Sequence, residues 1–68
     1  MIFMTERDLF LMYLSQIAEM IVNCQQMTQE GYKQWKQQTR DSTPYEAKGF
    51  MEKVIEVVGR HSGHQVSV

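Results

Sequence analysis

The sequence predicts an all-α protein: an antiparallel hairpin of two helices that assembles into a helical bundle. Three observations predict this fold. Apolar side chains recur with the 3.6-residue period of a helix over residues 6–39. A second stretch with the same period begins at Pro44, the one proline of the 68-residue chain. A short polar connection separates the two stretches, and helices joined by a short loop lie antiparallel.

The first predicted helix spans residues 6–39. Thr5 is a candidate N-cap, and acidic residues follow in the first turn, where the helix dipole favours negative charge. Met4 can pack against Leu9 as a hydrophobic staple that closes the helix start. On a helical projection centred on Ile17, one apolar stripe runs along the whole length. Its other members are Phe10, Tyr13, Leu14, Met20, Ile21, Cys24, Gly31, Tyr32 and Trp35.

The weak point of this helix lies at residues 28–31. Thr28 can cap a new helix, and Gly31 costs about 1 kcal/mol relative to alanine in a helix interior. The alternative is therefore a pair of helices, 6–27 and 29–39, which permits a compact three-helix monomer. We favour the single helix because the same apolar stripe continues through the weak point.

The second predicted helix spans residues 44–59. The sequence Thr43-Pro44-Tyr45-Glu46 is typical of a capping box with proline at the first helical position, and Gly59 is a candidate residue for the C-terminal cap. We expect residues 1–60 to form one hairpin domain and residues 61–68 a flexible tail. The predicted core stripe of this helix comprises Ala47, Met51, Val54 and Val58.

The two predicted helices differ in length, at about 50 Å and 25 Å for 1.5 Å per residue. The shorter helix can cover only the C-terminal half of the longer one, which leaves the apolar residues 9–22 without cover. That segment is also apolar on a second side, through Leu11, Ala18 and Val22. We therefore expect association, either with a second copy or with a helix of another protein. The expected interface residues are Phe10, Leu11, Met12, Tyr13, Leu14, Ile17 and Val22.

Composition narrows the class of protein. The net charge is −1 and the pI about 6.0, which indicates no general affinity for polyanions. Residues 9–24 are the most apolar stretch, but they include polar side chains and are shorter than the ~20 residues that a membrane-spanning helix needs. The chain has one cysteine and no recognisable secretory signal, so we expect a cytoplasmic protein without membrane partners.

The sequence indicates no catalytic set, cofactor or metal site, so we expect no enzymatic activity. Cys24 lies in the core stripe and has no neighbouring cation to lower its thiol pKa, which favours a small buried side chain over a nucleophile. His61 and His64 are spaced for one helix face, but they follow and flank glycines and have no third ligand nearby.

A second function class remains open, a nucleotide or nucleic-acid binding module. Lys33, Lys36 and Arg40 share one sector of the first predicted helix, beside Tyr32. Such a face can hold a phosphate or stack a base. Three cations are few for a phosphate backbone, so a solvated helix face is the favoured interpretation.

The expected hairpin resembles small bacterial and phage regulators that work by covering a helix of a partner, such as co-chaperones and anti-sigma-type inhibitors. The segment GYKQWKQQ, ahead of a second helix, is similar to the small hairpin co-chaperones of type III secretion. The resemblance in shape implies a helical regulator that binds protein, whereas the similarity of the short segment implies no fold, function or residue role.

Overall fold

The computed structural model describes residues 5–64. Within that range the chain is entirely helical in its regular structure, as predicted, and contains no strand. The predicted staple between Met4 and Leu9 falls partly outside the described residues. The elements are α1 (Glu6–Met12), α2 (Leu14–Gln25), α3 (Gln29–Ser42), the 3₁₀ turn η1 (Tyr45–Ala47) and α4 (Lys48–Ser62).

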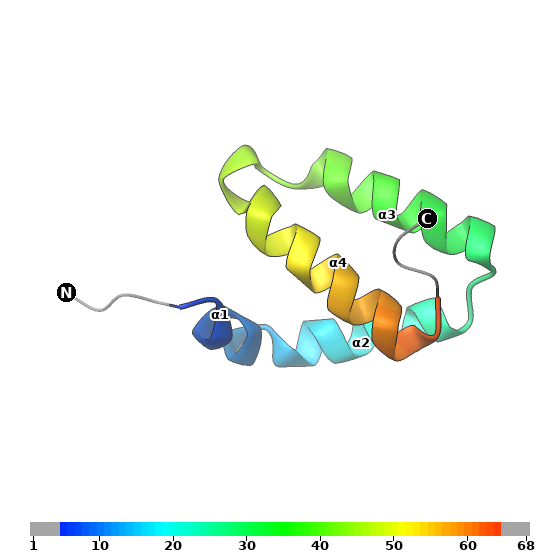
Figure 1. Cartoon of the computed structure of the whole chain (residues 1–68), viewed down its shortest axis with the longest axis horizontal. Helices are drawn as coiled ribbons and strands as arrows, with labels where there is room; N and C mark the ends of the chain where they lie inside the picture. The colour runs from blue at the N-terminus through cyan, green and yellow to red at the C-terminus, as the bar shows by residue number, and fades with distance from the viewer. Residues whose placement is uncertain (1–4, 65–68) are drawn as a thin grey trace.

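Helix α4 lies between α2 and α3 and packs against both (Figure 1). In Figure 1, α2 and α4 run in the same direction. Helix α3 runs in the opposite direction and leads from the end of α2 back to the start of α4. The single helix predicted over residues 6–39 is therefore wrong, and so is the two-helix hairpin. The chain forms a compact three-helix arrangement, with α1 as a short additional helix turned away from the axis of α2.

The break between α2 and α3 is made by Thr28. Its hydroxyl oxygen accepts a hydrogen bond from the backbone N–H of Gly31 at 3.0 Å, which satisfies one free donor of the new helix. A Cβ atom at Gly31 would lie 3.3 Å from that same oxygen, so glycine leaves room for the cap. The weak point noted in the sequence is thus a true helix boundary, and it allows α3 to fold back over α4.

A second break, at Tyr13, was not predicted. The backbone there has φ −102° and ψ 17°, outside regular helix geometry, although the segment contains neither proline nor glycine. The rings of Phe10 and Tyr13 both contact Phe50 of α4, with centroid distances of 5.3 and 6.2 Å. These contacts, with an ion pair of 2.8 Å between Glu6 and Lys53, hold α1 against the N-terminal half of α4.

The start of α1 agrees with the prediction. Thr5 is the N-cap, and its hydroxyl accepts a hydrogen bond from the backbone N–H of Asp8 at 3.3 Å. The carboxylate of Asp8 accepts in return from the backbone N–H of Thr5 at 3.1 Å, which completes a capping box. Both hydrogen bonds join near neighbours in the chain, so this helix start could be predicted from the local sequence.

The bounds predicted for the second helix, residues 44–59, are wrong at both ends. Thr43 does not cap it, because its hydroxyl donates to the carbonyl of Thr39, and the chain first forms η1. At the other end α4 continues through Gly59 to Ser62, and Gly63 caps it with a left-handed φ of 83°. The first two residues of the predicted tail therefore belong to the helix.

The core consists of side chains from α2, α3 and α4, and α4 lies at its centre. Tyr32 and Val58 are fully buried, and the hydroxyl of Tyr32 donates to the carbonyl of Ile55 at 3.4 Å. The apolar stripe found in the sequence thus marks the core correctly at Ile17, Cys24 and Tyr32. It is wrong at Tyr13 and Leu14, which are 42% and 56% exposed. The buried core cluster comprises Ile17, Cys24, Tyr32, Val54 and Val58.

Candidate protein-binding surface

Five of the seven residues predicted for the interface are exposed on α1, on α2 or at the junction between them. The exposed fractions range from 42% for Tyr13 to 60% for Leu11. They are large apolar side chains, and all keep a large part of their surface exposed, although the ring of Tyr13 also contacts Phe50 of α4. The five residues are Leu11, Met12, Tyr13, Leu14 and Val22.

The other two predicted interface residues lie inside the fold. Ile17 is 4% exposed and belongs to the buried core cluster. Phe10 is half-buried, with its ring edge against Phe50. Both are on the side of their helices that faces α4, so the structure separates them from the exposed set.

The exposed residues of α2 form a stripe at one-turn spacing. Leu14, Ala18 and Val22 follow one another at i, i+4 and i+8, and all three are exposed. We call these three residues the outer stripe. Helix α4 packs on the side of α2 that carries Ile17 and Cys24, and the outer stripe is left exposed to solvent. Leu11 and Met12 at the end of α1 extend the apolar surface beyond the break.

A second apolar feature lies on the other flank of α2. A groove of about 280 Å³ opens between α2 and the start of α4, and its lining is almost entirely apolar. The sequence predicted Ala47, Met51 and Val54 of this lining as core residues. It did not predict the groove, because the groove depends on how far α2 lies from the start of α4 in the folded chain. The lining residues are Tyr13, Gln16, Ile17, Met20, Ala47, Phe50, Met51 and Val54.

The predicted nucleotide face does not assemble into an open site. Tyr32 is fully buried, and Lys36 is 4% exposed with its Nζ 4.9 Å from the centroid of the Tyr32 ring. Arg40 makes a bidentate ion pair with Glu52, in which two guanidinium nitrogens donate to the two carboxylate oxygens at 2.7 and 3.0 Å. Only Lys33 of the predicted set is exposed.

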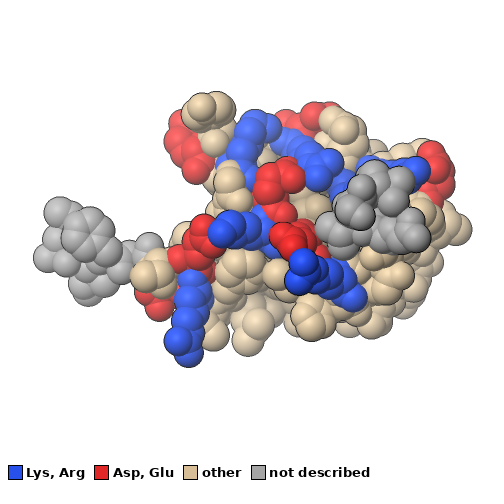
Figure 2. All heavy atoms as spheres, viewed as in Figure 1, with Lys and Arg blue, Asp and Glu red and all other residues tan. Residues whose placement is uncertain are grey.

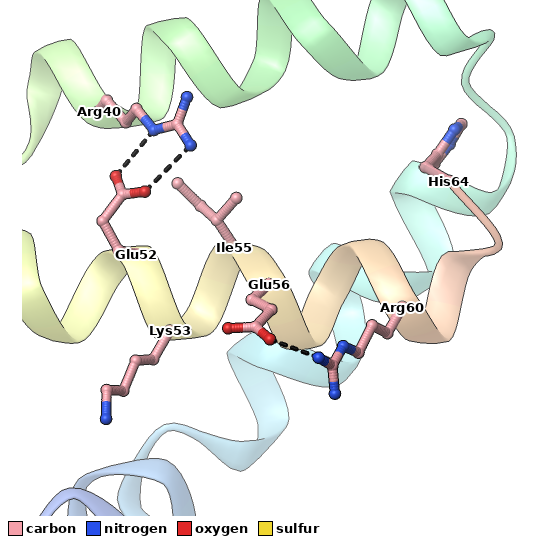
Figure 3. A pocket seen from close by; sticks show the side chains of 7 residues that line it. All are labelled: Arg40, Glu52, Lys53, Ile55, Glu56, Arg60 and His64. Atoms are coloured by element: carbon pink, nitrogen blue, oxygen red, sulfur yellow. Dashed lines mark hydrogen bonds and ion pairs between the residues drawn. The ribbon is translucent and has the colours of Figure 1, made fainter. Parts of the chain in front are cut away.

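Opposite charges alternate on the face of α4 seen in Figure 2, while the part of this view over α2 is largely uncharged. Figure 3 shows the shallow hollow beneath this face, of about 630 Å³. Its cations are paired within the chain: Arg40 with Glu52, Lys53 with Glu6, and Arg60 with Glu56. The arginine holds the pKa of the Glu52 carboxyl below its ordinary value, mainly by hydrogen bonding. Paired cations leave little charge for an external phosphate.

Cys24 has the surroundings of a structural cysteine. It is fully buried, and burial raises the pKa of its thiol, which disfavours the reactive thiolate. Over residues 5–64 no three histidine, cysteine, aspartate or glutamate side chains come close enough to hold a metal ion. His64 instead contacts the fold through backbone and amide oxygens, on α2 and α3.

No described helix combines the length and the apolar character that crossing a membrane requires. Comparison of the chain with known protein families, with curated proteins and with solved structures found no match.

Proposed function

We propose that this chain is a small non-enzymatic helical module that binds protein through the outer stripe of α2 and the adjoining end of α1. The observation that carries the proposal is the exposure of Leu11, Met12, Leu14 and Val22, each between 52% and 60%, within one short segment. The largest contiguous apolar patch of a small protein is often its functional surface. A partner that covers this surface gains the free energy of burying it.

The charge of the segment supports the same proposal. Between Leu9 and Gln29 the sequence contains a single charged residue, Glu19, and that residue does not belong to the outer stripe. A partner helix can therefore lie along α2 without removing an ion from water, which is the costly step in many polar interfaces. This is helix-on-helix recognition, in which residues one turn apart anchor the partner.

A photo-crosslinking experiment tests the proposal. In cells that express the chain, Val22 is replaced by p-benzoylphenylalanine, and Gln38 on the exposed polar side of α3 is replaced in the same way as a matched control. Irradiation should give a covalent adduct from position 22 and none from position 38. The Leu14→Asp change added to the position-22 chain should remove the adduct. Equal adduct yields from both positions, or none from position 22, would contradict the proposal.

A further inference from the structure

We infer that the partner of the outer stripe is a second copy of this chain, with two α2 helices packed antiparallel and the two Ala18 residues at the crossing point. The inference rests on the proposed function above and names its partner. It follows from the symmetry, the charge and the area of the exposed surface.

The outer stripe has the same order of side-chain sizes in both directions. Leu14 and Val22 are large, and Ala18 lies midway between them, one helical turn from each. A two-fold axis beside Ala18 therefore places Leu14 of each copy against Val22 of the other copy, which gives two equivalent contacts. Such an interface is self-complementary, as closed dimers require. The small central residue lets the two backbones approach, and rows at i and i+4 are the ridges that interlock in the commonest helix packing.

The charge distribution permits this arrangement. Glu19 is the one charged residue of α2, and it lies beside the stripe rather than in it. The net charge of −1 per chain gives two copies little mutual repulsion. The paired charges near α4 belong to Arg40, Glu52, Lys53, Glu6, Arg60 and Glu56, and none of these residues lies on α2.

The exposed area is of the size that a small dimer needs. Leu11, Met12, Leu14 and Val22 leave 52–60% of their surface exposed. Taking on the order of 150–200 Å² for the whole surface of a large apolar residue, the four expose about 400 Å² per copy. Complete burial of these side chains in both copies removes about 800 Å² of apolar surface from water, which is the size of a small, weak dimer interface.

Paired cysteine variants test both the partner and the orientation. Leu14→Cys and Val22→Cys chains are prepared separately, and the native Cys24 stays in place because it is fully buried. Antiparallel packing predicts a disulfide when the two variants are mixed and oxidised, and none when either is oxidised alone. The unmodified chain should have twice the 8.0 kDa mass of one copy by light scattering. A monomer at millimolar concentration, or a disulfide within either variant alone, overturns the inference.

Ala18→Arg provides an independent test, with Gln38→Arg as the control of equal charge on α3. The Ala18→Arg chain should keep its helical circular dichroism and become monomeric, whereas the Gln38→Arg chain should stay dimeric. A dimer that survives Ala18→Arg overturns the inference. If the chain is monomeric and the crosslinker at position 22 forms an adduct whose mass differs from two copies, this inference fails and the proposed function stands. If that position forms no adduct, the proposed function fails as well.

Discussion

The imidazole ring of His64 lies flat on the phenol ring of Tyr32, with centroids 4.4 Å apart and ring planes 4° apart. Its Nε2 lies 2.6 Å from the carbonyl oxygen of Cys24, and its Nδ1 lies 3.1 Å from Oε1 of Gln29. A residue just past the end of α4 thus joins that end to the last turn of α2 and the first turn of α3.

Replacing His64 with alanine should lower the free energy of unfolding by about 1–2 kcal/mol, because a ring contact and a partly buried hydrogen bond are both lost. Urea unfolding followed by circular dichroism measures the change. His61→Ala is the matched control, since His61 is exposed, and it should leave the midpoint nearly unchanged. Equal effects of the two changes would contradict a role for the His64 contacts.

The cap at Thr28 should also be measurable. Thr28→Ala removes the acceptor for the Gly31 N–H and should cost about 1 kcal/mol in the same urea assay. Thr28→Ser keeps an acceptor oxygen at that position and should recover most of the loss. If serine is as destabilising as alanine, the hydroxyl is not what stabilises the boundary between α2 and α3.

An aspartate should have different effects at two neighbouring positions of α2. Ile17→Asp places a carboxylate in the core and should cost more than about 3 kcal/mol, enough to unfold a domain of this size. Leu14→Asp changes a side chain that is 56% exposed and should leave the helical signal intact. Circular dichroism of the two purified variants checks this. Loss of helix in the Leu14→Asp chain would mean that Leu14 supports the fold itself.

The ion pair between Arg40 and Glu52 should make a small, pH-dependent contribution to stability. The pKa of Glu52 is lowered in the folded chain, so its contribution is present above the pKa of the unfolded carboxyl and is lost as the pH falls through the folded value. Glu52→Gln should cost less than about 1 kcal/mol at pH 7 and nothing at about pH 2. Urea unfolding at both pH values tests this, with Glu46→Gln as the exposed control.

The thiol of Cys24 should resist modification. Because burial raises its pKa and hides it from solvent, a disulfide reagent should label the native chain far more slowly than the urea-unfolded chain at pH 8. Gln38→Cys adds an exposed thiol on α3, away from the outer stripe, and should label at once. Rapid labelling of Cys24 in the native chain would contradict its burial.

Much of the core could be predicted from the sequence, but the course of the chain was left between two alternatives, and the favoured single helix is wrong. The apolar stripe correctly joined Ile17, Cys24 and Tyr32, since all three face α4. It could not show that the helix ends between the last two. A projection at 100° per residue records only which side of a helix is apolar. One continuous helix and two helices packed on either side of a third can give the same apolar side, so the projection does not distinguish them.

The remaining differences depend on contacts between residues far apart in sequence. The break at Tyr13 coincides with packing on Phe50, and no local residue type announces it. His64 contacts Cys24 of α2 and Gln29 of α3, which are 40 and 35 residues away in the sequence. The helical pattern that could be recognised in the sequence ended earlier, at Gly59. In contrast, the cap at Thr5 involves only neighbours in the chain, and the sequence predicted it correctly.

The central place of α4 has a consequence for how the chain is made. Helices α2 and α3 diverge from the turn that joins them, and both pack on α4, which follows them in the chain and therefore leaves the ribosome after them (Figure 1). Until Val54 and Val58 have emerged, the nascent chain has no core on which α2 can settle. Both apolar flanks of α2 therefore stay exposed until α4 has emerged, and another nascent chain or a chaperone can bind them during that interval.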